Sequence, residues 1–368
     1  MEDLIKMIPY GHQSIDEDDI SAVVEVLRSD WITQGSNVDE FERAVAKYCG
    51  VQFAVAMSSG TAGLHAACSV VGLKGFEAVT TPITFAATSN AVVYCGGKPV
   101  FSDIREDTLN IDPHKIKITA KIKAIIPVDF AGHPADMDEI MKLAHDTDCI
   151  VIEDACHALG AEYRGRKVGS IADMTVFSFH PVKHITTGEG GMVMTNNEVY
   201  YKKLKEFRSH GIVRGTRVSQ PWYSPIVELG YNYRLTDFQC ALGISQLKKL
   251  DKFVIRRREI AEKYSKAFTG VKEIVTPIEL DYVKSSYHIY VIQCDNRDEM
   301  FSRLKNNNIG VQVHYLPVHL HPFYQKNYGY KVGDFPISER YYSRALTLPL
   351  YPSMSEDDID YVINAVTG

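Results

Sequence analysis

The sequence lacks the features of a membrane protein, an exported protein and a zinc ribbon. No apolar stretch approaches the ~18 residues that a membrane-spanning helix needs. The start, MEDLIKMIPYGHQSIDEDD, has acidic residues where an export signal has a basic flank and an apolar run. Seven cysteines are an odd number and include no C-x-x-C pair, which argues against a disulfide framework and a zinc ribbon. We therefore expect a cytoplasmic protein with reduced thiols and no membrane partner.

The sequence also lacks the excess of basic residues that is typical of nucleic-acid-binding proteins. The formal net charge is -6, so nothing attracts the chain as a whole to nucleic acid. The one dense basic run, Arg256 to Arg258, lies in a helix-like segment, and we interpret it as a solvated face. A chain of 368 residues, 45% of them hydrophobic, suits one large domain and one smaller domain. We expect these domains at residues 1–250 and 251–368.

Short β-rich runs alternate with helix-like segments from residue 50 onward. A strand buried on both faces needs a nearly continuous apolar run, and IIPV and CIVI have that form. The alternation predicts an α/β fold with a central, mostly parallel sheet between helices. The predicted strands are 54–57, 78–81, 99–103, 123–129, 149–154, 174–179 and 191–195.

Other segments predict the rest of the architecture. Ser14 to Glu17 has the form of a capping box, so a helix should open the fold. One long helix-like stretch, roughly 237–268, can bridge two domains. Beyond it, strand-like runs at 288–294 and 309–315 flank a helix-like stretch at 297–307, which indicates a small α+β domain.

Candidate functional residues follow the predicted strands, because ligands of an open parallel sheet bind beyond the carboxyl ends of its strands. The turn SSGTAG at 58–63 enters a helix, and free amides there suit a phosphate, although an ordinary turn has the same form. Asp154 ends a very apolar strand and needs backbone amides or a cation as its partner. Lys183 follows the strand at 174–179. A lysine near both features can form a Schiff base with an aldehyde cofactor that also carries a phosphate and a ring nitrogen.

Five ordered motifs resemble the sugar aminotransferases of the DegT/DnrJ/EryC1 family. They are TPITFAAT at 81–88, EDACHALG at 153–160, FSFHPVK at 177–183, TGEGG at 187–191 and GYNYR at 230–234. The resemblance covers nearly the whole chain. It implies a fold-type I, aspartate-aminotransferase-like transferase with a seven-stranded sheet, a small C-terminal α+β domain and pyridoxal 5′-phosphate (PLP) as cofactor. It also implies a homodimer with two active sites at the subunit interface.

The resemblance implies a role for each matched residue. Lys183 should hold the cofactor aldehyde, and Asp154 should lie beneath the pyridine nitrogen. Phe85 matches the aromatic position that stacks on the ring, and His157 stands where many relatives have glutamine. The remaining matches are Thr61, Ala62 and Ser178 at the phosphate, Asn232 reaching the phosphate from the neighbouring subunit, and His314 and Tyr315 near the sugar nucleotide.

The residue at position 183 decides the type of reaction in this family. Relatives with histidine there remove a hydroxyl, whereas lysine favours transamination. We expect L-glutamate to give its amino group, forming 2-oxoglutarate, and a UDP-linked 4-keto-6-deoxy-N-acetylhexosamine to accept it at carbon 4. Another dTDP-, GDP- or UDP-linked 4-keto sugar is the alternative. Arg234 fits an interface salt bridge or a substrate contact, and the sequence favours neither.

Three other interpretations fit parts of the sequence. Tyr163 and Lys167 fit the Y-x-x-x-K of nicotinamide-dependent sugar-nucleotide dehydratases and epimerases, but the glycine-rich turn of that class is missing and the segment reads better as a hairpin. A non-catalytic binding module would have lost Lys183 or Asp154. A metal cluster of His314, His319 and His321 is disfavoured because two prolines interrupt the run.

Overall fold

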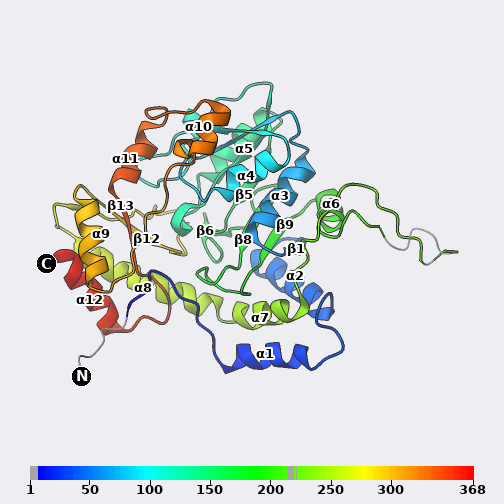
Figure 1. Cartoon of the computed structure of the whole chain (residues 1–368), viewed down its shortest axis with the longest axis horizontal. Helices are drawn as coiled ribbons and strands as arrows, with labels where there is room; N and C mark the ends of the chain where they lie inside the picture. The colour runs from blue at the N-terminus through cyan, green and yellow to red at the C-terminus, as the bar shows by residue number, and fades with distance from the viewer. Residues whose placement is uncertain (1–6, 214–218, 221) are drawn as a thin grey trace.

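A seven-stranded sheet forms the centre of the structure, a computed structural model that describes residues 7–213, 219–220 and 222–368 (Figure 1). The strands lie in the order β1-β9-β8-β5-β4-β2-β3, and β9 alone in this sheet runs antiparallel to its neighbours. The predicted α/β fold with a mostly parallel sheet is therefore confirmed. The strands are Phe53–Met57 (β1), Glu77–Thr80 (β2), Lys98–Phe101 (β3), Ile122–Ile126 (β4), Ile150–Asp154 (β5), Met174–Ser178 (β8) and Gly191–Thr195 (β9).

Helices cover both faces of this sheet. One face carries Gly60–Val71 (α3), Ala87–Tyr94 (α4) and Glu198–Arg208 (α6), and the other carries Ser36–Cys49 (α2), Met137–Asp146 (α5) and Asp237–Leu247 (α7). Successive residues of a strand serve opposite faces, so Val176 packs on the α3 side and Phe177 on the α2 side. Asp154 lies two residues after Ile152, which packs on the α3 side, and its carboxylate therefore points to that side.

The first helix, Glu17–Leu27 (α1), does not begin with the expected capping box at Ser14. Its N-cap is Asp16, whose side chain accepts hydrogen bonds from the amides of Asp18 and Asp19. The Asp19 carboxylate in turn accepts a hydrogen bond from the Asp16 amide. Aspartate caps a helix as well as serine does, and Asp16 and Asp19 repeat the same spacing two positions further on.

The single helix expected over about 237–268 is two helices. α7 ends at Leu247, and Leu250–Phe268 (α8) begins after a turn at Lys248 and Lys249. The Lys249 amine lies 2.9 Å from the Asp19 carboxylate, so an ion pair joins the turn between α7 and α8 to α1. No glycine or proline marks the turn, which is why the helical periodicity of the sequence continues through it.

A second, smaller unit follows α8. Its sheet has the order β10-β12-β13, and α8, α9 and α12 share its apolar core. Ile8, near the other end of the chain, packs into the same core and its backbone bridges to Ile309. A boundary at residue 250 stays a prediction. The elements are Ile274–Val275 (β10), Tyr290–Cys294 (β12), Ala345–Leu348 (β13), Arg297–Asn306 (α9) and Glu356–Thr367 (α12).

Shorter elements complete the chain. The hairpin predicted around Tyr163 and Lys167 is confirmed, because β6 and β7 pair antiparallel there. The strand expected at 309–315 is wrong: this described stretch makes only isolated bridges, from Ile309 and Gln312, and its later residues line a cavity instead. The elements are Glu162–Tyr163 (β6), Arg166–Lys167 (β7), Val283–Lys284 (β11), Pro322–Tyr328 (α10), Pro336–Arg344 (α11), and the 3₁₀ turns Pro113–Lys115 (η1), Phe130–Gly132 (η2) and Val318–Leu320 (η3).

The sequence suggested that the basic run on α8 is a solvated face, and this is wrong for one of its three residues. Arg256 and Arg258 are partly exposed and form ion pairs with Glu356 and Glu279, but Arg257 between them is fully buried. A run of like residues on a helix places its members on different faces. The middle arginine therefore points inward while its neighbours face outward.

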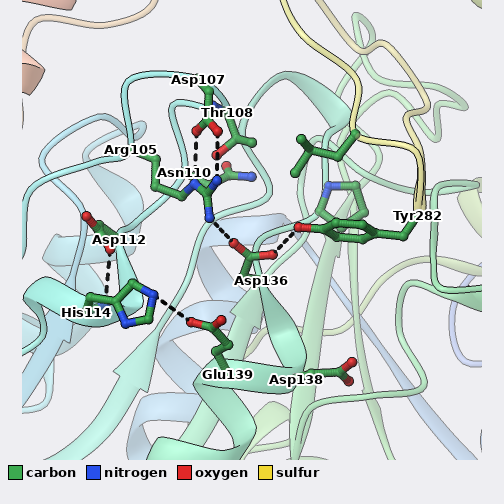
Figure 2. A network of polar contacts seen from close by, with 12 residues as sticks. Arg105, Asp107, Thr108, Asn110, Asp112, His114, Asp136, Asp138, Glu139 and Tyr282 are labelled. Carbon is green, nitrogen blue, oxygen red and sulfur yellow. Dashed lines mark hydrogen bonds and ion pairs between the residues drawn. The ribbon is translucent and has the colours of Figure 1, made fainter.

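A network of polar contacts joins the loop after β3 to the loop that precedes β11 (Figure 2). Arg105 binds both carboxylate oxygens of Asp107, at 2.9 and 2.7 Å, and one oxygen of Asp136 at 2.7 Å. The hydroxyl of Tyr282 donates to the other oxygen of Asp136 at 2.7 Å. Two-point binding of this kind is the strongest form of an arginine–carboxylate pair, so the network fixes three loops relative to one another.

An arm, residues 209–213 and 222–232, extends from the body of the molecule after α6 (Figure 1). Bridges from Ser209 to Asn232 and from Ile212 to Ile226 pair its two sides. Leu229 is 80% exposed and Trp222 is 78% exposed, which is unusual for large apolar side chains. No helix in the described ranges is both long and apolar enough to cross a membrane.

Candidate active site

A cavity of about 580 Å³ lies where β1, β5 and β8 end, beside the 312–315 segment of the smaller unit. A ligand site at the carboxyl ends of these strands is what the topology predicts. The cavity brings together most of the residues that the sequence singled out, from five separate parts of the chain. These are Thr61, Phe85, Asp154, His157, Ser178, Lys183, His314 and Tyr315.

The start of α3 forms one wall of the cavity. Ser59 is the N-cap, and its hydroxyl accepts a hydrogen bond from the Ala62 amide at 3.1 Å. This leaves the preceding amides of the first turn to an anion. A Cβ atom at Gly60 would lie 3.0 Å from Cβ of Ser178, and one at Gly191 would lie 2.4 Å from the carbonyl oxygen of Ser59. Glycine at both positions therefore permits the close approach that shapes this cradle.

Asp154 lies on the floor of the cavity at the end of β5. It is 5% exposed, and its carboxylate accepts hydrogen bonds from the Thr88 hydroxyl at 2.6 Å and the Cys156 amide at 3.2 Å. Two donors fix the orientation of the carboxylate without neutralising it. A buried carboxylate of this kind can hold a proton on a ring nitrogen placed above it.

Lys183 lies in the loop after β8 and lines the same cavity. Its amine is 3.5 Å from Nε2 of His288, which lies two residues before the start of β12. Burial lowers the pKa of Lys183 from its ordinary value, and the charge of Arg257 lowers it further, whereas Cys156 and Asp154 act in the opposite direction. A lysine with a lowered pKa is a better nucleophile and proton acceptor near neutral pH.

Four buried histidines surround Lys183: His157, His184, His288 and His314. Burial lowers the pKa of each, that of His314 to about 4, so all four imidazoles are neutral at neutral pH. Nε2 of His157 lies 3.1 Å from the Tyr315 hydroxyl. The Nδ1 atoms of His157 and His288 are buried without a hydrogen-bond partner among the described residues. Unpaired buried nitrogens are costly, and a bound polar group would satisfy them.

Three predicted residues need separate mention. The ring of Phe85 is 61% exposed at the cavity and lies 6.1 Å from the ring of Tyr315. Ala62 is buried and does not line the cavity, and its amide donates to the Ser59 hydroxyl. Asn232 is exposed on the arm and is likewise not among the lining residues. A single chain therefore does not bring Asn232 to the cavity.

Sequence reasoning missed several lining residues, above all His288 and Tyr10. It also missed Thr88, which does not line the cavity but donates a hydrogen bond to the Asp154 carboxylate. His288 precedes β12 of the second sheet, and Tyr10 belongs to the segment before α1. The rule that ligands bind beyond strand ends covers neither position. Thr88, in contrast, is the second residue of α4 and the last residue of the TPITFAAT motif, which was a usable signal.

The donor set fits PLP. The cofactor presents a phosphate, a basic ring nitrogen and an aldehyde, which need an anion cradle, a buried carboxylate and an amine. The start of α3 and Ser178 form the anion cradle, Asp154 is the buried carboxylate, and Lys183 is the amine. All three lie in one cavity. The unpaired Nδ1 of His157 offers a further polar contact.

Comparisons with known proteins agree with this geometry. The model of the DegT/DnrJ/EryC1/StrS aminotransferase family matches residues 13–367. The UDP-4-amino-4,6-dideoxy-N-acetyl-beta-L-altrosamine transaminase of Campylobacter jejuni is 44% identical over 369 residues, which are 97% of this chain and 96% of the relative.

Two solved structures extend the likeness to three dimensions. Helicobacter pylori PseC, an aminotransferase involved in the biosynthesis of pseudoaminic acid, has a TM-score of 0.92 and 32% identity, with 98% of each chain covered. The PLP-form of the putative sugar aminotransferase Spr1654 from Streptococcus pneumoniae has a TM-score of 0.93 and 31% identity, again with 98% of each chain covered.

Proposed function

The chain belongs to the DegT/DnrJ/EryC1/StrS aminotransferase family, and from this premise we propose that it aminates carbon 4 of a UDP-linked 4-keto-6-deoxy-N-acetylhexosamine, with L-glutamate as donor. The protein is a PLP-dependent sugar aminotransferase with the fold-type I architecture of that class. The finer choice of substrate is supported by the 44% identity to the Campylobacter jejuni transaminase.

One observation carries the assignment of the site: Lys183 and Asp154 line one cavity beside the start of α3. In this proposal Lys183 holds the cofactor, and Thr61 and Ser178 bind its phosphate with the amides of α3. Bound PLP supplies an electron sink for the carbon that loses its proton. Asp154 keeps a proton on the ring nitrogen, because a buried carboxylate favours the cationic form of its neighbour.

The proton movements belong to Lys183. Once its amine is free, it would take a proton from the α-carbon of the donor and pass it to the cofactor. In the second half of the reaction it would take a proton back from the cofactor and deliver it to carbon 4 of the sugar. The face from which it delivers that proton fixes the configuration of the product. Donor and acceptor use the same cavity in turn, so ping-pong kinetics follow.

The sugar-nucleotide side of the proposal includes His314, Tyr315 and a second subunit. Both residues line the cavity next to Phe85. Asn232 lies on an arm whose exposed apolar residues include Trp222 and Leu229. We propose that this arm packs on a second copy of the chain and brings Asn232 to the phosphate of the partner's cofactor.

A different 4-keto sugar nucleotide is the second candidate for the acceptor, because the UDP-4-amino-4-deoxy-L-arabinose–oxoglutarate aminotransferase of Shewanella sediminis is also 35% identical over 382 residues. We also propose a cytoplasmic location. It is supported by the seven thiols, all of which are unpaired in the structure, since the cytoplasm keeps thiols reduced.

Visible absorption of the PLP-loaded protein tests the proposal. The band of lysine-bound cofactor should bleach with L-glutamate and return with the UDP-linked 4-keto hexosamine, but not with the dTDP- or GDP-linked 4-keto hexoses. Return with one of those instead would move the assignment to that sugar. A protein that shows no band after addition of PLP would contradict the role given to Lys183.

A further inference from the structure

Arg257 of α8 is buried behind Lys183 and binds only backbone carbonyl groups. Its Nη1 donates to the carbonyls of His288 and Leu350, both at 3.0 Å, and more weakly to that of Tyr287 at 3.4 Å. Its Nη2 donates to the carbonyl of Lys183 at 3.5 Å. One guanidinium therefore joins the loop after β8, the residues that enter β12 and the residue pair after β13.

The charge of Arg257 has no counter-ion. In the described part of the chain no carboxylate lies within 4.0 Å of its guanidinium, whereas the arginines on either side both form ion pairs. Burial lowers the pKa of Arg257 to about 9, so it remains charged at neutral pH. A buried charge without a partner is costly to stability, and such a residue calls for another explanation.

We propose that Arg257 is a positioning residue for Lys183: its guanidinium fixes the backbone that carries Lys183 and His288, and it places an unpaired positive charge behind the loop from which the lysine amine extends. The inference rests on the proposed function, in which Lys183 is the cofactor lysine and the proton carrier. An ordinary lysine, with a pKa of about 10.4, is neutral in only about one molecule in 2,500 at pH 7. A general base must be neutral to act.

The groups that face the Lys183 amine support this role of the charge. Burial lowers the pKa of the amine most, Cys156 and Asp154, at the end of β5, raise it, and Arg257 from α8 lowers it. The surrounding imidazoles of His157, His184, His288 and His314 are neutral, because burial lowers the pKa of each. Arg257 is thus the fixed positive charge that opposes the carboxylate of Asp154.

Labelling of Lys183 in the full-length, cofactor-free protein tests the proposal. The rate of acetylation by acetic anhydride is followed across pH by peptide mass spectrometry, and its midpoint reports the titration of the amine. R257M removes the charge and keeps an apolar side chain of similar length. R257K keeps the charge but loses the guanidinium group that binds several carbonyls at once. R256M removes the neighbouring charge on the same helix and serves as the control. We expect R257M to raise the midpoint above that of the wild type, because the positive charge that opposes protonation of the amine is gone.

R257K should leave the midpoint within a few tenths of a unit, and so should R256M. If the midpoint is the same in all four proteins, or if R257K moves it as far as R257M, the charge has no such role. Should R257M not fold, R257Q must show the same rise. A purely structural arginine would lower the melting temperature without moving the midpoint. No cofactor or substrate enters this assay, so its failure is distinct from failure of the proposed reaction.

Discussion

The carboxyl groups of Asp129 and Glu153 face each other, fully buried, on the side of the sheet opposite the Asp154 carboxylate. One oxygen of each is bound, by the Ala135 amide at 2.9 Å and the Thr175 hydroxyl at 2.7 Å. The other two oxygens have no donor among the described residues. Two carboxylates cannot meet in this way unless they share a proton.

A shared proton makes the stability of the fold depend on pH. Burial raises the pKa of Glu153 to about 7, and burial together with the Glu153 charge raises the pKa of Asp129 well above its ordinary range. A carboxyl whose pKa is higher in the folded than in the unfolded protein contributes stability at low pH, and this is lost as pH rises through the folded value. The free energy of unfolding, measured by urea titration, should therefore fall as pH rises through about 7.

The variant D129N supplies a permanent donor to Glu153 and should weaken this pH dependence. D138N, a change at an exposed aspartate, serves as the control and should keep it. Equal slopes in wild type and D129N would show that the pair does not hold the proton.

K183A should lower the rate of transamination by at least about a thousandfold, since both proton transfers lose their carrier. The loss is measured as kcat with L-glutamate and the accepted sugar nucleotide. Melting temperature should change little, because the side chain lines a cavity rather than filling a core. K202A, at a surface lysine paired with Glu198, is the matched control. Retained turnover in K183A would remove Lys183 from the mechanism.

D154N should bind PLP but lower kcat by about a hundredfold or more, because the ring nitrogen loses its charge partner. The Thr88 hydroxyl acts one step further out, since it donates to that carboxylate. T88V should therefore cost about tenfold in kcat, the effect of one lost hydrogen bond, and T88S should restore it. A T88S enzyme as slow as T88V would mean that packing at Thr88 matters instead of its hydroxyl.

Asn232 can be tested by mixing subunits. K183A and N232A should each be impaired as homodimers, N232A through weaker retention of PLP in equilibrium dialysis. If Asn232 serves the neighbouring site, an equimolar mixture refolded together should recover about a quarter of wild-type activity, because half of the dimers are mixed and each has one intact site. A mixture no more active than the average of its parents would place Asn232 in its own subunit's site or outside both.

The ion pair of Arg105 and Asp107 should stabilise the fold at neutral pH and lose this effect only in strong acid. The Arg105 guanidinium holds the pKa of Asp107 at about 2, below its ordinary value. A carboxyl with a lowered folded pKa contributes stability above its unfolded pKa, near 4, and loses it as pH falls toward 2. D107N should lower the melting temperature at pH 7 but not at pH 2. An equal effect at both pH values would show that the charge of Asp107 contributes nothing.

The sequence predicts those parts of the site that strands of the large sheet position. Thr61 and Lys183 follow such strands and Asp154 ends one, and parallel strands bring their carboxyl ends to one edge whatever the side chains elsewhere. His288 and Tyr10 escape prediction because they reach the cavity only through packing of the second unit and of the N-terminal segment. Arg257 has the same local pattern as Arg256, and only the tertiary structure separates a buried residue from an exposed one.

Residues 8–16 are anchored at both ends, to the smaller unit through Ile8 and to the larger through Asp16, which caps α1 and pairs with Lys249. Tyr10 lies between these anchors and forms part of the cavity wall. The carbonyl of Tyr10 accepts a hydrogen bond from the Leu350 amide at 3.0 Å, and the Tyr10 ring lies 5.6 Å from the ring of His314. The N-terminal segment therefore gives the cavity a wall that is fastened to the smaller unit, although the segment itself continues into the first helix of the larger one.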